Sequence, residues 1–319
     1  MLGKSIKRLL AISLINVSIF AMGGCATSQP AKVADTASKP AATATPATKS
    51  TGNAPSVILD TTAIAPTKVF DKLYFIGTKG TGVWLLNTTD GLILIDSMND
   101  TADAKNIIVP GIKALGFDPA DIKYVLVTHG HCDHYGGAKY IQDTYGSKVL
   151  LTTVDWDLMN KNFTDKAAGK PGMPAPPLPT SYSAITDGQK LTLGDTTITI
   201  VSTPGHTPGG VSLIIPVTDN GTKHTVAMWG GTGLPQSLAD NKAYLSSLDY
   251  FAKFTDAAKV DAEITAHSTV DNGAARMETL TTRKTGDLNP FVIGQDAYKV
   301  YMDKMKTTVN TNIEKLSKK

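Results

Sequence analysis

The chain has 319 residues, of which 41% are hydrophobic and 18% charged, and its formal net charge is +3. This composition supplies a sizeable core and excludes a coiled coil, a collagen-like chain and a chain disordered throughout. The positive excess comes from Lys4, Lys7 and Arg8, since without these three 28 of the 31 basic residues remain against 28 acidic ones. A nucleic-acid binder keeps a basic excess in its folded part, so no nucleic-acid partner is expected.

Residues 1–24 have the pattern of a secretory signal peptide, with a basic start and an apolar stretch at 9–22 that is too short to span a bilayer. The stretch ends in Met22-Gly23-Gly24-Cys25, which resembles a bacterial lipoprotein cleavage box. We therefore expect Cys25 to be the lipidated N-terminus, and ordinary signal-peptide cleavage near Cys25 is the alternative. The expected location is the periplasm or cell envelope, with a lipid anchor in the membrane.

Residues 25–56 are mostly Ala, Thr, Pro, Ser and Lys, which predicts a flexible linker. A folded domain is expected at 57–319, where apolar runs predict strands and helical periodicity predicts helices. In chain order we expect strands at 69–76, 83–87 and 92–96, a helix at 102–115, a strand at 124–128, a helix at 137–145, a strand at 148–152, a helix at 155–163, strands at 191–193, 196–202, 211–217 and 225–229, a helix at 241–259, a strand at 262–265 and a helix at 296–316.

Two proline-containing segments interrupt this pattern. Pro110 lies inside the expected helix at 102–115 and should kink or break it. Residues 170–180 hold five prolines and are expected to be irregular. The order of the elements suits an α/β fold in which two mixed sheets pack together, with helices on the outside.

Three of the six histidines fall within one short motif, Thr128-His129-Gly130-His131-Cys132-Asp133-His134, directly after an expected strand. Imidazole and carboxylate groups are good zinc ligands, and one loop at a strand end can point them toward a common centre. His129 and His131 are two residues apart and can share one ion. Asp133 and His134 are adjacent and cannot easily turn to the same ion, so they suggest a second one.

Two further loops can complete the two sites. His206 lies in the Pro/Gly-rich turn Thr203-Pro204-Gly205-His206-Thr207-Pro208-Gly209-Gly210, and His267 follows the short strand at 262–265. Both lie at strand ends, where α/β sheets gather their chemistry. His224 lies in a polar turn and is expected to have no metal role. We interpret Cys132 as a packed thiol, or as one that supports the site from behind the ligands.

The histidine motif, the turn around His206 and the late His267 together resemble the metallo-β-lactamase superfamily, from about residue 69 onward. This resemblance implies an αββα sandwich with a dinuclear zinc site between the sheets. It also implies that Asp96, at the end of an early strand, supports the metal loop. Carried over by position, the ligands of the first Zn²⁺ are His129, His131 and His206, and those of the second are Asp133, His134 and His267.

One departure narrows the resemblance. Most hydrolases of the superfamily have a bridging Asp in a Gly-Asp pair after a strand, but this chain has Met228-Trp229-Gly230-Gly231-Thr232-Gly233. Thr232 occupies the position of that Asp, or Gly231 does if the alignment with the family's Gly-Asp pair is shifted by one residue. β-Lactamases of subclass B1 have Cys there and those of subclass B3 have Ser. The complete set of histidines with a hydroxyl residue is most similar to subclass B3.

The resemblance implies an enzyme in which a hydroxide that bridges two Zn²⁺ ions opens the β-lactam ring of antibiotics, and thereby gives antibiotic resistance. Asp133 would act both as a ligand and as the group that orients the nucleophile, and no Ser or Cys nucleophile is needed. Residues 77–82 and 170–180 are expected to border the cleft and to shape substrate choice. The alternatives are another hydrolase of this fold, a lactonase or a thioesterase, and a non-enzymatic metal-binding surface lipoprotein.

Overall fold

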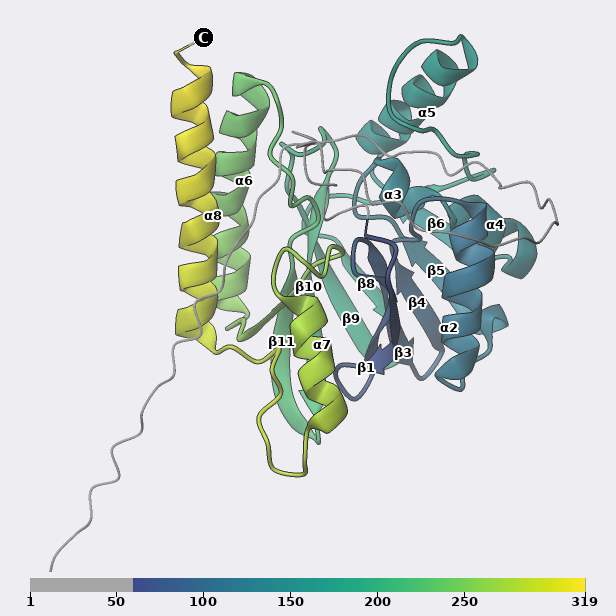
Figure 1. Ribbon diagram of the computed structural model, residues 1–319, viewed down its shortest axis with the longest axis vertical. Coiled ribbons are helices and arrows are strands. Elements are labelled where there is room, and N and C mark those ends of the chain that lie inside the picture. The colour runs from purple at the N-terminus through teal and green to yellow at the C-terminus, as the bar shows by residue number, and fades with distance from the viewer. Residues whose placement is uncertain (1–59, 319) are drawn as a thin grey trace, which may run out of the picture.

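The computed structural model describes residues 60–318, so the predicted signal peptide, Cys25 and the linker lie outside the described residues. The described chain forms four layers, with two sheets packed face to face and helices on both outer faces (Figure 1). This is the αββα sandwich that the resemblance implied. None of the helices in this part of the chain combines the length and the apolar character needed to cross a bilayer.

The first sheet has seven strands, which lie side by side in chain order. Its first four strands pair antiparallel through short turns, and the remaining pairs are parallel, because helices connect the strands across the outer face. The strands are β1 (Ala63–Lys68), β2 (Leu73–Thr78), β3 (Gly82–Thr88), β4 (Gly91–Ile95), β5 (Ile122–Leu126), β6 (Lys148–Leu151) and β7 (Ser183–Ala184).

The second sheet has five strands in the order β12-β11-β10-β9-β8. The four consecutive strands from β8 through β11 pair antiparallel, each with the next. β12 is parallel to β11, and the chain reaches it through the long helix α6 (Leu238–Ala257). The strands are β8 (Lys190–Leu193), β9 (Thr196–Ser202), β10 (Val211–Asp219), β11 (Thr222–Met228) and β12 (Ala262–Ile264).

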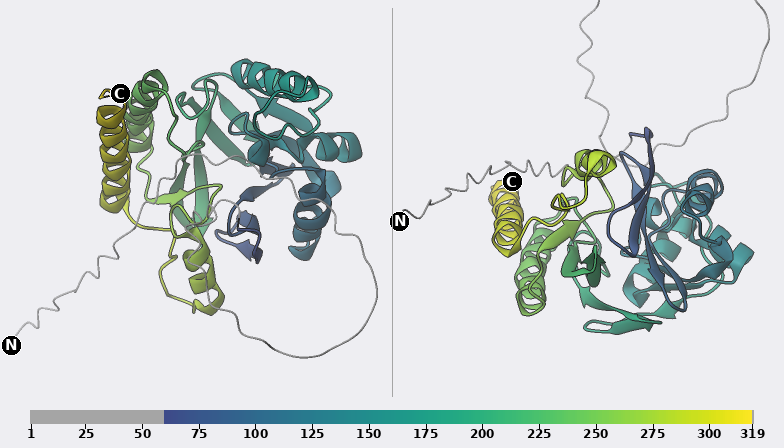
Figure 2. Two further views of the ribbon diagram at one scale, coloured as in Figure 1. Left: turned by 45° about the horizontal axis from the view of Figure 1, so that its top comes forward. Right: turned by 90° about the horizontal axis from the view of Figure 1, so that it is seen from below.

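The helices form the outer layers. On the second sheet, α6 and α8 (Gln295–Leu316) lie side by side along its outer face, as both views in Figure 2 show. The remaining helical segments are α1 (Thr101–Asp103), η2 (Ala104–Ile108), α2 (Val109–Ala114), η3 (Pro119–Asp121), α3 (Cys132–Tyr135), α4 (Ala138–Tyr145), α5 (Thr153–Ala167) and α7 (Gly273–Thr282).

Two predicted elements differ from the structure. The strand expected at 69–76 begins only at Leu73, because the backbone N–H groups of Val69 and Phe70 both donate to the Leu73 carbonyl oxygen, at 2.9 and 3.0 Å, and turn the chain between β1 and β2. The helix containing Pro110 is not broken. Just before the proline, the N–H of Val109 donates to the carbonyl of Ala104, five residues earlier, and this wider turn accommodates the ring.

In the core between the two sheets, Trp84 of the first sheet contacts residues of the C-terminal part of the chain. Trp84 on β3 packs edge to face against Phe75 and Phe291, with ring centroids 5.3 and 6.1 Å apart. All three rings are fully buried. The indole Nε1 of Trp84 donates to the carbonyl oxygen of Thr265 at 2.8 Å, which holds the loop after β12 against the first sheet.

Candidate metal centre

The loops that follow β5, β9 and β12 carry the predicted ligands, and hydrogen bonds tie these loops together across the two sheets. The N–H of Val211, at the start of β10, donates to the Thr128 carbonyl at 2.9 Å. The N–H of Gly82 donates to the Ala266 carbonyl at 2.9 Å, so the loop after β12 is joined to β3. The carboxyl ends of these strands therefore gather at one end of the sandwich.

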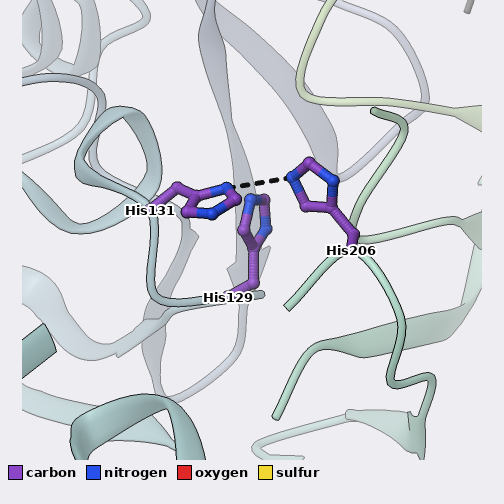
Figure 3. Close-up of side chains that lie close together, drawn as sticks. All are labelled: His129, His131 and His206. Carbon is purple, nitrogen blue, oxygen red and sulfur yellow. Dashed lines mark hydrogen bonds between the residues drawn. The ribbon is translucent and has the colours of Figure 1, made fainter. Parts of the chain in front are cut away.

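The first group consists of His129, His131 and His206, whose potential ligand atoms all lie within 4.8 Å of one another. The three rings point toward a common centre, and Nδ1 of His131 lies 3.0 Å from Nε2 of His206 (Figure 3). Nε2 of His129 is buried and has no hydrogen-bond partner among the described residues. A buried polar atom without a partner is costly, so this nitrogen, on which two further imidazoles converge, fits a bound cation.

The electrostatics of the first group favour neutral imidazoles. Burial holds the pKa of His129 and of His206 well below the ordinary value. Burial also lowers the pKa of His131 to about 4, although the nearby Asp133 carboxylate acts in the opposite direction. Near neutral pH these rings are therefore uncharged, which is the form that offers a lone pair to a metal ion.

The second group consists of Asp133, His134 and His267, whose potential ligand atoms also lie within 4.8 Å of one another. Nε2 of His134 lies 3.3 Å from Nε2 of His267, and Asp133 Oδ2 lies 3.5 and 3.6 Å from these two nitrogens. The rings of His129 and His134 are only 3.8 Å apart between centroids, so the two groups are adjacent. They share no residue, as the spacing of the histidine motif predicted.

Backbone carbonyls orient one histidine of each group. Nδ1 of His206 lies 2.6 Å from the Gly233 carbonyl oxygen, and Nδ1 of His267 lies 2.8 Å from the Gly80 carbonyl oxygen. With Nδ1 as the donor, each ring keeps its proton on the outward side and turns the lone pair of Nε2 toward the group.

Asp96 orients the histidine at the centre of the second group. This fully buried residue follows β4 and has a left-handed backbone, with φ of 64°. Its Oδ2 lies 2.8 Å from Nδ1 of His134, and its two carboxylate oxygens accept from the N–H and the hydroxyl of Thr128 at 2.8 and 3.0 Å. Burial opposes the effect, but the carboxylates of Asp133 and Asp96 raise the pKa of His134 to about 10. These two carboxylates place negative charge in this half of the site, which suits a divalent cation.

At Gly231, one of the two positions matched to the bridging Asp, there is no space for a side chain. A Cβ on Gly231 would lie 2.5 Å from Cβ of His206 and 2.7 Å from its Cγ and Cδ2. Thr232 is buried beside it, but its hydroxyl makes no hydrogen bond to any residue in the range 60–318. The supporting role of Thr232 stays a prediction, and the contact that this segment does make with a ligand is through the backbone carbonyl of Gly233.

We did not predict Asp155 from the sequence, although it joins the two loops of the first group. Its Oδ2 accepts from the N–H of Gly130 and from the hydroxyl of Thr207, both at 2.7 Å, and its Oδ1 accepts from the N–H of Gly209 at 2.8 Å. The available signal was its place in the first helical turn after a buried strand, whereas Asp96 was expected because the family resemblance implied its role. An acidic residue in the first turn of a helix is also common, so its position alone did not distinguish it.

Two further predictions concern residues outside the ligand groups. Nδ1 of His224 lies 2.7 Å from Oδ2 of Asp261, and neither residue belongs to the two groups of potential ligands found among the described residues. Cys132 is buried at the start of α3, in the core between the first sheet and its helices. Its interpretation as a thiol stays a prediction.

Comparisons with known proteins agree with this arrangement. Residues 77–219 match the family described as the metallo-beta-lactamase superfamily. The N-acyl homoserine lactonase AttM of Rhizobium radiobacter is 32% identical over 167 residues, which are 48% of this chain and 62% of that protein. The chain thus spans less than two thirds of that curated relative.

Solved structures extend the similarity over most of the chain. BJP-1, a subclass B3 metallo-beta-lactamase of Bradyrhizobium japonicum, shows a TM-score of 0.65 at 27% identity, covering 80% of this chain and 94% of that one. FEZ-1 from Legionella gormanii shows the same fold, with a TM-score of 0.69 at 24% identity and coverage of 80% and 98%. Residues 77–219 therefore match the metallo-beta-lactamase superfamily, a family of hydrolases, and the solved structures show that the described chain has its fold.

Proposed function

We propose that this protein is a zinc-dependent hydrolase that opens the β-lactam ring, in the manner of a subclass B3 metallo-β-lactamase. The observation that carries the proposal is the pair of adjacent ligand groups that share no carboxylate. A bridging Asp has no place at Gly231, because the His206 ring occupies the space in which its side chain would start. The histidine set and the missing bridge are the features that resemble subclass B3.

In this proposal one zinc ion is held by His129, His131 and His206, and a second by Asp133, His134 and His267. Bound zinc supplies a Lewis acid for the carbonyl oxygen and lowers the pKa of a coordinated water. The Asp133 carboxylate, which belongs to the second group, would also accept a hydrogen bond from the attacking water and so orient it. Asp96 keeps the outward proton of His134 in place, and burial of the rings keeps bulk water from the ligand nitrogens.

A lactonase is the second candidate, because the AttM relative is named as an N-acyl homoserine lactonase. A lactone, like a β-lactam, presents a carbonyl group within a ring. The purified chain should be assayed on nitrocefin and imipenem beside N-acyl homoserine lactones and a thioester panel, with zinc counted by elemental analysis. Turnover of β-lactams at least about 100-fold above that of the lactones supports the first proposal. Lactone turnover without β-lactam turnover replaces it with the second.

Two results of the same assay lead elsewhere. Thioester turnover alone indicates a thioesterase of this fold. Two bound zinc ions without turnover of any substrate indicate the metal-binding surface lipoprotein that the sequence left open. His206→Ala should abolish any zinc-dependent turnover, and it serves as the blank in every arm.

We also propose that the protein is exported and anchored by lipid at Cys25. The support is the leader at 1–24 and the cleavage box that ends at Cys25. Cys25→Ser should move the protein from the membrane fraction to the soluble fraction of cells and should prevent incorporation of labelled fatty acid. Unchanged membrane association of this variant would reject the anchor.

A further inference from the structure

One carboxylate lies behind the first ligand group and touches both of the loops that carry it. Asp155 is in the first turn of α5 and is only 1% exposed. It accepts one hydrogen bond from the loop between His129 and His131, through Gly130, and two from the loop after His206, through Thr207 and Gly209. It belongs to neither ligand group.

We propose that Asp155 is a positioning residue that sets the separation between the two loops, so that His131 and His206 face each other across the first zinc site. The inference rests on the metal centre of the proposed function but does not depend on which substrate is hydrolysed.

The chemistry of the three donors requires a carboxylate. Two backbone N–H groups and one hydroxyl point at Asp155, at 2.7 to 2.8 Å. None of the described basic side chains forms an ion pair with it. Its negative charge is instead stabilised by these donors and by the N-terminal end of α5. A charged acceptor bonded in this way holds its donors more strongly than a neutral one does.

Both loops approach the start of α5 too closely for a side chain at their glycines. A Cβ on Gly130 would lie 2.9 Å from the carbonyl oxygen of Asp155. A Cβ on Gly209 would lie 2.4 Å from Oγ1 of Thr152, whose hydroxyl donates to the Gly209 carbonyl at 2.7 Å. Both loops therefore pack directly against the first turn of α5, and this close packing fixes their position relative to the helix.

Asp155→Asn is the most informative change, because it keeps the shape of the side chain and replaces one acceptor by a donor. At least one of the three donors then faces an NH₂ group, and the loop that carries it shifts. Loss of a group that orients metal ligands lowers metal affinity by about 10- to 100-fold. The loss should fall on the group of His129, His131 and His206, because the loops that Asp155 joins carry these three ligands.

The test is a stepwise zinc titration of the full chain in competition with a chromophoric chelator. His206→Ala and His267→Ala first show which binding step belongs to which group. Asp155→Asn should weaken the step that His206→Ala removes by about 10- to 100-fold, and leave the other step within about twofold. Thr207→Val should weaken the same step and Thr207→Ser should restore it. Asp157→Asn, on the exposed side of α5, should match the wild type.

The thermal stability of the metal-free protein separates positioning from general support. If both zinc steps weaken equally in Asp155→Asn and the metal-free protein melts earlier in parallel, Asp155 is merely structural and the proposal is overturned. Unchanged zinc binding in both Asp155→Asn and Thr207→Val also overturns it. If Asp155→Asn does not fold, the comparison of Thr207→Val with Thr207→Ser tests the proposal in its place. Because no substrate is used, failure of the β-lactam assay leaves this result intact.

Discussion

Nδ1 of His134 lies 2.8 Å from Oδ2 of Asp96, and the carboxylate is held from its other side by Thr128. This contact determines which nitrogen of His134 can serve as a ligand. While Asp96 accepts, a proton stays on Nδ1, so Nε2, which faces His267 and Asp133, is the nitrogen left to bind a metal ion.

Asp96→Asn should reverse this tautomer. Asn tolerates the left-handed backbone at this position, so the main chain is retained. With the amide oxygen kept on the Thr128 N–H, the amide NH₂ faces Nδ1 of His134, and the imidazole proton moves to Nε2. We expect the zinc step of the second group to weaken by about 10- to 100-fold, measured by chelator competition. Wild-type affinity for both ions would contradict the assigned role of Asp96.

A direct ligand should matter more than a supporting residue. His206→Ala removes one of three nitrogens of the first group, so zinc content should fall and kcat/KM should drop by more than about 100-fold. His224→Ala is the matched control, because it removes a histidine that bonds to Asp261 outside both groups. Elemental analysis and steady-state kinetics check both variants. Equal losses from the two variants would show that the effect is one of general stability.

The proline-rich segment is expected to affect substrate choice without affecting zinc. Near its C-terminal end, the ring of Tyr182 stacks on Trp156 of α5 at 4.4 Å between centroids, so the segment is attached to the helix whose start contacts the metal loops. Replacing residues 170–180 by a short Gly/Ser linker should change the ratio of kcat/KM values across the substrate panel, while two zinc ions remain bound. Identical kinetics for every substrate would remove this segment from the substrate site.

A buried ion pair joins β12 to α7 beside the loop that carries His267. The guanidinium of Arg276 donates to Oε1 of Glu263 at 2.5 Å, and Asp271 is buried nearby. Burial raises the pKa of Glu263, although Arg276 acts against this effect. Arg276→Met leaves the carboxylate without its partner and should lower the free energy of unfolding by about 3–5 kcal/mol, measured by urea denaturation.

The double variant Arg276→Met with Glu263→Leu should recover part of this loss, because it no longer buries an unpaired charge. Lys161→Met, which breaks the exposed pair with Asp165, should cost no more than about 1 kcal/mol. A double variant no more stable than the single one would show that the cost comes from packing of the arginine stem.

All six predicted ligands fall into two compact groups in the structure, and the reason is local. The three segments that carry them each follow a strand, and strand ends can be located from apolar runs bounded by Gly and Pro. The histidine motif also concentrates rare residues in one short segment, which a chance sequence with six histidines seldom does. The long helices α6 and α8 of the outer layer were also expected from the sequence, whereas α7 was not.

The missed features depend on hydrogen bonds that no pattern of residue types indicates. The turn at Val69 and Phe70 interrupts an apolar run that looks continuous, because both N–H groups bond to Leu73 rather than to a neighbouring strand. The helix around Pro110 continues through a wider turn that no local pattern indicates. Asp155 acquires its role only when two loops from far apart in the chain are placed against α5.

The hydrogen bonds that position His267 join segments far apart in the chain, and this affects the order in which the ligand groups form. His267 contacts the carbonyl of Gly80, 187 residues earlier, and Trp84 holds Thr265 over a similar distance. As the chain emerges N-terminus first, from the ribosome or from an export channel, His129, His131 and His206 are all released before His267. The ligands of the first proposed zinc site are therefore available before those of the second, which is complete only when the final third of the polypeptide has docked.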